Sequence, residues 1–343
     1  MKKIIYINYM KQFGHINFDQ IQINALSMQG YDVKVVMHQD IAKKMKLHKN
    51  MYALILPKIL GYECKNSLIN RLFFILTLLF IRIRINWKEF DFCIISNLDE
   101  ITLCIVPLAK KMYLFCHGNC RDLGNKIKLR VLQYLSKKHV FLVFNRDMAD
   151  TFSNYGFKNV KIISHGCTTA FNSHIGHEAS QITKGFNYVA FHPSSKPDAG
   201  FLHDIYNKEN NEILKEYNVL LLLRNNPFKD YNFSNIKFIN KYLETKLYND
   251  LFTISDVIIL AYPNSFRHQV SGVSFECVAN RKNMLVYKNS SLDYCKDFYN
   301  YDIFCKDTTE LIQKLTELKL NKDKYKIIVS KDDLTPNYKP ILP

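Results

Sequence analysis

The sequence predicts an α/β protein made of two doubly wound domains that face each other across a cleft. Its 343 residues allow two domains with full hydrophobic cores, and a content of 48% hydrophobic residues excludes a disordered chain. Short β-branched runs alternate with segments of helical apolar periodicity, which is the pattern of a parallel sheet covered by helices. This alternation stops once, near the middle of the chain, and then begins again.

The first half alternates strands and helices up to residue 163. The expected strands are residues 3–7, 32–37, 92–96, 112–116, 139–144 and 160–163. The expected helices are residues 18–29, 68–85, 100–109, 126–136 and 146–154. In a sheet of this kind ligands bind at the carboxyl ends of the strands, where the winding reverses.

The middle of the chain, residues 165–185, is rich in Gly, Ser, Thr and His and has no periodicity. We therefore expect a linker at residues 169–186 between an N-terminal domain, residues 1–168, and a C-terminal domain, residues 187–343. The alternative is a long surface loop within one domain, but a structureless loop of about twenty residues is uncommon in a compact unit.

The second half repeats the pattern. Its expected strands are residues 188–191, 219–223, 236–239, 257–260 and 284–287. Its expected helices are residues 209–216, 245–254, 273–279, 292–298 and 308–318.

The most informative stretch runs from Leu247 to Val286 and contains helix, buried strand, loop, helix and strand in that order. Tyr262-Pro263 ends the buried strand, since proline cannot continue a central ladder. Ser271-Gly272 then opens a helix that carries Glu276. Free amides at a helix N-terminus favour phosphate, and glycine lets the phosphate come close. A carboxylate one to two turns further on suits a ribose, so the pattern indicates a nucleotide diphosphate. An ordinary βα unit with a capping serine is the alternative.

Two further motifs follow strands of the first half. Gly14-His15 lies between the first strand and a long helix, which makes Gly14 a close-approach position and His15 a cleft residue. Only one glycine of Gly-x-Gly-x-x-Gly is present, so this is no dinucleotide fingerprint. His117 follows another strand, where an imidazole is well placed for hydrogen bonding or proton transfer. A turn glycine with an incidental histidine, and a loop histidine that caps the next helix, are the alternatives.

Positive charge is concentrated in the first half. Residues 1–170 contain 25 Lys and Arg against 11 Asp and Glu, whereas the rest contains 22 against 20. Such asymmetry indicates an anionic partner, either nucleic acid or lipid. No zinc finger, no Lys/Arg run and no basic-aromatic RNA motif is present, so we expect no nucleic-acid partner.

The segment 68–87, LINRLFFILTLLFIRIRINW, favours lipid. Its continuous apolar part is about ten residues long, whereas a span across a bilayer takes about twenty. Arginines flank this part and Trp87 follows it, as in a helix lying in the headgroup region. A buried core helix with charged ends is the alternative.

Nine cysteines lie at irregular spacing without a Cys-x-x-Cys pair, and Met1-Lys2-Lys3 leads into an apolar run too short for a secretory signal. These features predict reduced thiols in the cytoplasm. Cys116 and Cys120 lie near His117, but no second ligand pair has metal spacing, so we expect neither a metal site nor a cofactor.

The series of helix, Asp-Val strand, Tyr-Pro, loop, Ser-Gly, Glu and strand resembles the donor site of GT-B glycosyltransferases, whose two Rossmann-like domains face across a cleft. It is most similar to the retaining group that builds bacterial surface polysaccharides. The glycine loop at Gly14, the strand-end His117 and the run FNRDMADTFSNYGFKNVKIISHG resemble the N-terminal domain of the same enzymes. The family pattern has two glutamates eight positions apart. Glu276 matches the second, and His268 stands in place of the first.

The resemblance implies a hexosyltransferase that moves a sugar from a nucleotide-sugar donor to a hydroxyl acceptor without a metal. It implies donor binding by the second domain, through Lys196, Arg224, Tyr262, His268, Ser271, Gly272, Val273 and Glu276. His117 and Glu276 are the implied catalytic residues, and Gly14 and His15 lie on the acceptor side. The arginine that usually accompanies the lysine is missing, and Arg224 or His192 would replace it.

The resemblance also implies a lipid-linked oligosaccharide acceptor, O-antigen or capsule synthesis, and a peripheral location on the inner face of the cell membrane. The basic N-terminal domain would face that anionic surface. Two alternatives are a nucleotide-sugar epimerase of the same fold and a catalytically inactive membrane-associated homologue, the latter because the first glutamate is missing.

Overall fold

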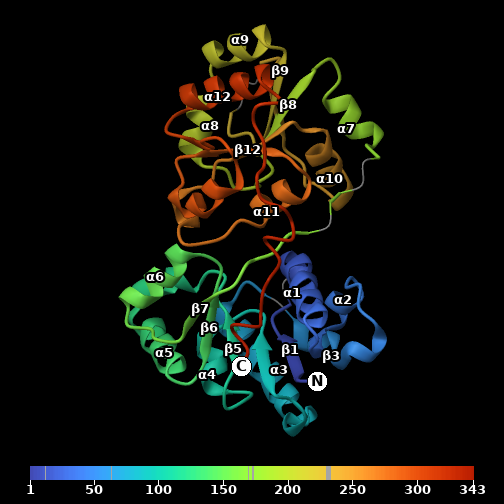
Figure 1. Ribbon diagram of the computed structural model, residues 1–343, viewed down its shortest axis with the longest axis vertical. Helices are drawn as coiled ribbons and strands as arrows, with labels where there is room; N and C mark the ends of the chain where they lie inside the picture. The colour runs from blue at the N-terminus through green and yellow to red at the C-terminus, as the bar shows by residue number, and fades with distance from the viewer. Residues whose placement is uncertain (12, 63, 169, 172–173, 229–232) are drawn as a thin grey trace. The chain divides into compact units, whose positions relative to one another are not determined.

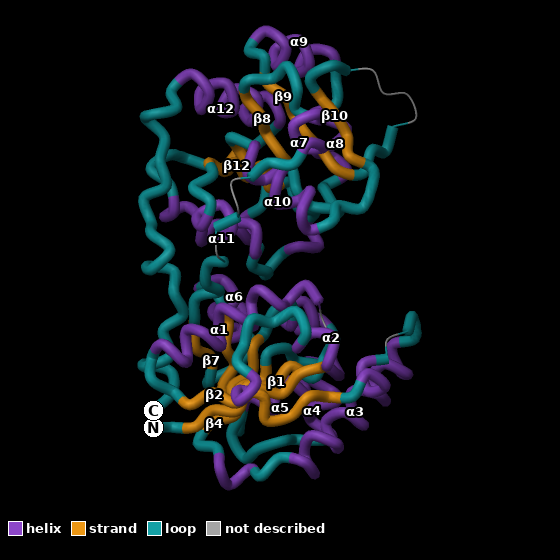
Figure 2. The backbone as a smooth tube through the Cα atoms, turned by 90° about the vertical axis from the view of Figure 1, so that its right-hand side faces the viewer, coloured by secondary structure: helices purple, strands orange, loops and turns teal. Residues whose placement is uncertain are grey.

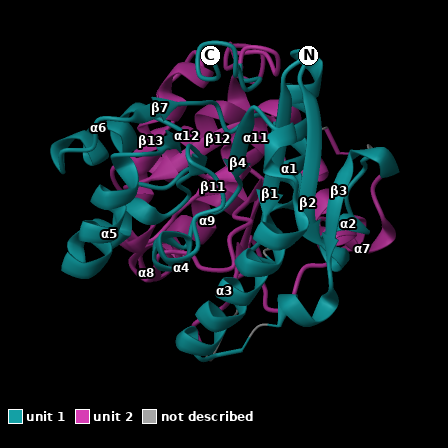
Figure 3. Ribbon diagram, turned by 90° about the horizontal axis from the view of Figure 1, so that it is seen from below, with its two compact units in different colours: residues 1–166, 268–270, 334–343 teal, residues 167–267, 271–333 magenta. Residues whose placement is uncertain are grey.

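The computed structural model describes residues 1–11, 13–62, 64–168, 170–171, 174–228 and 233–343 (Figure 1). It contains two parallel sheets flanked by helices, which Figure 2 shows as two separate sets of strands. Contacts divide the chain into two compact units (Figure 3). Unit 1 contains residues 1–166, 268–270 and 334–343, and unit 2 contains residues 167–267 and 271–333.

Unit 1 has a seven-stranded parallel sheet with the order β3-β2-β1-β4-β5-β6-β7. The order reverses between β1 and β4, which makes the carboxyl ends of these two strands the switch point. The strands are β1 Lys3–Asn8, β2 Asp32–His38, β3 Tyr52–Leu56, β4 Phe92–Ile95, β5 Tyr113–Phe115, β6 Val140–Val143 and β7 Val160–Ile162. The helices are α1 Ile16–Met28, α2 Gln39–Ala42, α3 Ser67–Arg84, α4 Glu100–Ile105, α5 Lys126–Ser136 and α6 Arg146–Asn154.

The central strands of unit 1 form where apolar residues run without interruption, since helices cover both faces of a parallel sheet. β5 and β6 are buried throughout, and Ile7 of β1 lies between Val36 of β2 and Ile95 of β4. β3 was not predicted. It is an edge strand with half-exposed and exposed positions, so its composition lacks the signal of a buried strand.

Unit 2 has a six-stranded parallel sheet with the order β10-β9-β8-β11-β12-β13, and its switch point lies between β8 and β11. The strands are β8 Tyr188–Phe191, β9 Val219–Arg224, β10 Ile236–Ile239, β11 Val257–Leu260, β12 Asn283–Tyr287 and β13 Phe304–Cys305. The helices are α7 His177–Ile182, α8 Ala199–Ile205, α9 Lys208–Glu216, α10 Thr245–Ile254, α11 Gly272–Ala279 and α12 Thr308–Leu320. The predicted α/β fold class with two doubly wound sheets is therefore confirmed.

The unit boundaries differ from the predicted domains at the expected linker, at residues 268–270 and at the C-terminus. The stretch predicted as linker, 169–186, contains α7, because Ala179 is buried and the Gly176 amide donates to Asp250 Oδ2 of α10 at 3.1 Å. Residues 169 and 172–173 of that stretch lie outside the described residues. The C-terminal residues 334–343 belong to unit 1 rather than to the second domain. Tyr338 OH donates to Gln22 Oε1 of α1 at 2.6 Å, and this tyrosine is fully buried.

Helix α3 is amphipathic. Only Thr77, Leu78 and Ile81 are buried along its 18 residues, which argues against a core helix. Asn66 caps its N-terminus, with Oδ1 accepting from the amides of Leu68 and Ile69. Among the described residues, none of the helices has the length and apolar content to cross a membrane.

Candidate functional site

The carboxyl edge of the unit 2 sheet brings together most of the donor-side residues that the sequence singled out. Lys196 follows β8, Arg224 ends β9, and Tyr262 follows β11. The loop after Tyr262 leads through Ser271, the N-cap residue, into α11. Because β8 and β11 flank the switch point, this edge is where a doubly wound sheet binds its ligand.

The start of α11 offers backbone amides to an anion. Gly272 is exposed and Val273 is half-buried, and the first amides of a helix have no intrahelical acceptor. The amide of Ser271 is already used, since it donates to Tyr294 OH at 3.0 Å. Its Oγ lies 2.7 Å from Tyr262 OH and does not cap the helix. The Ser271 amide is therefore not available to a phosphate, and the helix start offers the amides of Gly272 and Val273.

Glu276 lies one turn further along α11. Tyr248 OH of α10 donates to its Oε2 at 2.6 Å, which fixes the carboxyl group. Burial raises the pKa of Glu276 to about 7, and the bond from Tyr248 partly opposes this rise. Its other oxygen, Oε1, accepts from no described residue. A carboxyl group held in this way can accept from a hydroxyl of a ligand.

The basic residues of this edge differ in charge and access. Lys196 is exposed, whereas Arg224 is 7% exposed and donates from Nη1 to Pro193 O at 3.1 Å. His192 Nε2 lies 3.3 Å from Ala261 O, and burial lowers the pKa of His192 to about 4. A neutral His192 cannot supply the charge of a missing arginine, so of the two predicted substitutes only Arg224 is a cation.

Unit 1 gathers three imidazoles, His15, His117 and His165, with Phe18 and Phe144; we call these five residues the histidine cluster. The ring centroids of His15 and His117 are 4.2 Å apart, and His117 lies 4.6 Å from Phe18. His165 lies 5.0 Å from Phe18. His117 follows β5 and His165 follows β7, so the cluster occupies the carboxyl edge of the sheet.

All three imidazoles of the histidine cluster are neutral near pH 7. Burial lowers the pKa of His15 and His165 to about 4. The pKa of His117 lies well below its ordinary value, first through burial and then through the other two imidazoles. His117 Nε2 lies 3.0 Å from Ser96 O, which holds its ring in place. Neutral rings in edge-on and tilted contact with phenyl groups suit an uncharged ligand rich in hydroxyls.

A buried carboxyl group lies behind the histidine cluster. Asp19 accepts from Tyr6 OH at 2.8 Å, from Asn8 Nδ2 at 2.6 Å and from Ser96 Oγ. Burial raises the pKa of Asp19 to about 6. Ser96 joins this network to the histidine cluster, because its Oγ donates to Asp19 and its carbonyl oxygen lies 3.0 Å from His117 Nε2. The sequence prediction did not include His165 or Asp19. The pair His165-Gly166 repeats the strand-end pattern of His117-Gly118 and was the available signal for the first of them.

Gly14 lies in a 3-10 turn, Phe13–His15, and is exposed. A Cβ built on it meets nothing within 4 Å, and its φ is not positive. Neither backbone conformation nor packing in this structure therefore requires glycine at position 14.

His268 lies in unit 1, whereas the other predicted donor-side residues lie in unit 2. Residues 268–270 belong to unit 1, where His268 Nδ1 lies 2.9 Å from Asp147 Oδ2 of α6. Its φ is +56°, a conformation that costs energy for a residue other than glycine. Among the described residues, no group of three His, Cys, Asp or Glu is arranged to hold a metal ion.

Solved structures match this chain over nearly its whole length. Alr3699/HepE of Anabaena, solved with UDP and glucose, is 13% identical and has a TM-score of 0.59, over 94% of this chain and 91% of that one. A sucrose-phosphate synthase of Thermosynechococcus elongatus is 10% identical and has a TM-score of 0.57, over 94% of this chain and 90% of that one. A Listeria monocytogenes protein assigned as a UDP-N-acetylglucosamine 2-epimerase is 10% identical and has a TM-score of 0.57, over 98% of this chain and 92% of that one.

The chain has the GT-B fold. Its two parallel sheets match the fold of the solved structures above, and at these identities the likeness concerns the fold alone. No protein-family model matches the chain, and no curated protein matches its sequence.

Proposed function

We propose that the protein is a glycosyltransferase that moves a hexosyl group from a nucleotide-sugar donor to a hydroxyl group of an acceptor. The observation that carries the proposal is the open start of α11 at the switch point of unit 2, followed one turn later by the fixed carboxyl group of Glu276. Amides that favour a diphosphate thus precede an acceptor that suits the ribose hydroxyls.

The chemistry requires charge to be stabilised on the leaving diphosphate as the glycosidic bond breaks. The amides of Gly272 and Val273 and the positive end of the helix dipole are fixed before the reaction, so they need no reorganisation. Lys196 and Arg224 supply positive charge on the neighbouring strand ends. The structures of HepE with UDP and of a trehalose-6-phosphate synthase with UDP-2-fluoro glucose support uridine nucleotides as the first donors to test.

We assign the histidine cluster to the transferred sugar and the acceptor hydroxyl. Its neutral imidazoles can donate and accept hydrogen bonds without attracting a second phosphate. His15 Nδ1 is buried and has no partner among the described residues, so it is a polar atom that a ligand hydroxyl would satisfy. Gly14, beside it, leaves room for the ligand to approach the backbone.

We further propose that the acceptor is a lipid-linked oligosaccharide of a bacterial surface polysaccharide, O-antigen or capsule, and that the enzyme works at the inner face of the cell membrane. The excess of 25 Lys and Arg over 11 Asp and Glu in residues 1–170 supports an anionic surface as partner. The exposed apolar face of α3 supports a lipid.

The test is binding of UDP and UDP-sugars to the purified chain, measured by thermal shift and calorimetry. Wild-type protein is expected to be stabilised by UDP in proportion to its occupancy. Glu276→Gln should weaken binding of UDP but not of inorganic diphosphate, since the carboxyl group meets ribose. Glu212→Gln, an exposed site on α9, is the matched control. If no nucleoside diphosphate of any base stabilises the protein, the proposal is wrong.

Experiments can distinguish two alternatives from a glycosyltransferase. The likeness to the Listeria protein favours a nucleotide-sugar epimerase as the second candidate. That candidate requires an isomerised nucleotide sugar to form from labelled donor without acceptor. An inactive homologue would bind the donor but neither hydrolyse nor transfer it, and loss of either activity in Glu276→Gln would exclude this candidate.

A further inference from the structure

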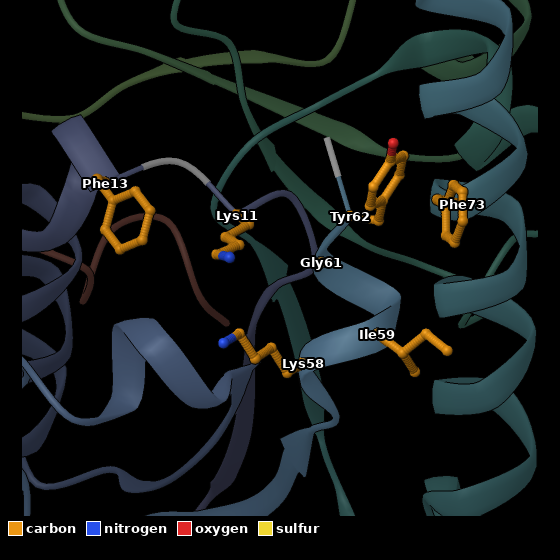
Figure 4. Close-up of a pocket in the computed structure, with 7 residues that line it drawn as sticks. All are labelled: Lys11, Phe13, Lys58, Ile59, Gly61, Tyr62 and Phe73. Carbon is orange, nitrogen blue, oxygen red and sulfur yellow. The ribbon is translucent and has the colours of Figure 1, made fainter. Parts of the chain in front are cut away.

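A cavity of about 530 Å³ opens in unit 1 beside α3. Its lining residues come from the loop after β1, from a 3-10 turn, Lys58–Gly61, and from α3; they are Lys11, Phe13, Lys58, Ile59, Gly61, Tyr62 and Phe73. In Figure 4 the two lysines lie between Phe13 on one side and the side chains of Ile59, Tyr62 and Phe73 on the other. The cavity therefore combines cationic groups with an apolar wall. Its volume falls within the range of small-molecule sites.

Positive charge outweighs negative charge at this cavity. Lys11 Nζ lies 2.7 Å from Asp40, and this hydrogen bond, with the further charges of Lys58 and Lys43, holds the pKa of Asp40 below its usual value. Lys44 Nζ lies 4.6 Å from the ring centroid of Phe13. Three lysines thus act on Asp40 and a fourth lies beside Phe13, so among the described residues near this cavity lysines outnumber carboxylates and favour an anion.

The fold holds Lys11 in this position. Its side chain is only 17% exposed, and a Cβ at Gly61 would approach its Cδ to 2.8 Å. The same Cβ would lie 2.9 Å from His38 Nδ1. Glycine at position 61 thus makes room for the lysine stem, and the cation does not have to be ordered when a ligand binds.

An exposed apolar stripe runs along α3 next to this cavity. Leu68, Leu72, Leu76, Leu79 and Ile83 recur at helical spacing, and the two end residues are 72% and 81% exposed. Phe73 and Tyr62, whose rings are 5.2 Å apart, join the stripe to the cavity, and Ile59 beside them is 74% exposed.

We propose that the cavity binds the diphosphate group of a polyprenyl-type lipid, with its hydrocarbon chain on the α3 stripe. The lysines attract the anionic diphosphate, and the apolar stripe removes the hydrocarbon chain from water. This inference rests on the proposed function, because it identifies the lipid carrier of the acceptor. The turn that contributes Phe13 to the cavity also contributes His15 to the histidine cluster, so a sugar attached to the bound diphosphate lies on the side of that cluster.

The experiment compares binding of the full chain to three kinds of phosphatidylcholine vesicle: with polyprenyl diphosphate, with phosphatidylglycerol at equal negative charge, and with neither. Cosedimentation gives the affinity. The single tryptophan, Trp87, directly follows the stripe and gives a second readout through its fluorescence. Wild-type protein is expected to prefer the polyprenyl diphosphate vesicles to those with equal charge.

Variants separate the cavity from the surface. Lys58→Gln should lower affinity for polyprenyl diphosphate vesicles about fivefold, the effect of one lysine at an anionic surface, and lower it less for phosphatidylglycerol. Leu72→Gln with Leu76→Gln should weaken binding to both. Lys137→Gln and Ile127→Gln, at exposed positions of α5 and its C-terminus, are the matched controls and should change neither.

Equal affinity of wild-type protein for the two anionic vesicles would overturn the inference and leave only a general membrane surface. An unchanged preference in Lys58→Gln would also overturn it. Thermal shift with UDP on the same samples keeps the two proposals apart. Retained UDP binding with no lipid preference refutes the cavity alone, and lipid preference without any nucleotide binding refutes the glycosyltransferase alone.

Discussion

The buried carboxyl group of Glu276 makes a quantitative prediction about stability. Burial raises its pKa from 4.5 to about 7 in the folded protein. The unfolded chain therefore releases this proton at lower pH than the folded chain does. Wild-type protein keeps the full contribution of the protonated group below pH 4.5, loses it as the pH rises, and has lost it above the folded pKa.

The size of the effect follows from the shift. A difference of roughly 2.5 pKa units corresponds to about 3 kcal/mol between the two protonation states. Glu276→Gln removes the titration, so its stability relative to wild type should improve by about 2.5 kcal/mol between pH 5 and pH 8. Any change in stability that the glutamine side chain causes independently of pH cancels when the difference from wild type at pH 8 is compared with the difference at pH 5. Glu212→Gln should follow wild type across the same range.

The assay is urea unfolding followed by far-UV circular dichroism at several pH values. Trp87 belongs to unit 1, so its fluorescence follows that unit and separates the two transitions if the units unfold independently. Parallel stability curves for wild type and Glu276→Gln would refute the reasoning. They would mean that water reaches the carboxyl group and that burial does not raise its pKa.

Three further predictions concern unit 1. Gly14→Ala should leave the melting temperature within about a degree, since its Cβ meets nothing, and should lower transfer to the acceptor in a steady-state assay. Because burial lowers the pKa of His15 and His165 to about 4 and holds the pKa of His117 well below its ordinary value, the rate of transfer should show no step from these histidines between pH 6 and 8 in a pH–rate profile. Gly166→Ala should cost about 2–4 kcal/mol in urea unfolding, because φ is +83° and the added Cβ collides with Ile21 Cγ2. Gly30→Ala, at φ +87° in open space, should cost only about 1 kcal/mol, and equal losses at the two sites would contradict the assigned packing.

The sequence predicted the central elements well for a physical reason. Strands buried on both faces must be apolar throughout, so β11 has the bounds expected from its composition. Helix α10 has the bounds expected from its apolar periodicity. Elements with mixed exposure gave no such signal. Edge strand β3 and the short helix α7 were missed, and the return of Tyr338 to α1 depends on contacts more than 300 positions apart.

The candidate site could be predicted in its position but not in its bonding. Proline after β11 and glycine at the start of α11 indicate a strand end and a helix start, which topology places at the sheet edge. Nothing local indicates that Tyr294 takes the Ser271 amide or that Tyr248 holds Glu276, because each pair joins separate elements. The sequence could therefore predict the helix start after β11 but not which of its amides are free.

Both units have strand orders that reverse beside their first strand, so topology alone would give them the same kind of ligand site. The side chains at the two edges make them different. In unit 2 a helix N-terminus, Lys196 and Arg224 favour an anion, whereas in unit 1 the edge is lined by uncharged imidazoles and phenyl rings. A phosphate would lose hydration there without gaining a counter-charge, which costs free energy. Sugar hydroxyls lose less and find donors and acceptors. The division of labour that we propose between nucleotide and sugar would thus follow from charge, and the lysine cavity beside α3 is where that proposal places a second diphosphate.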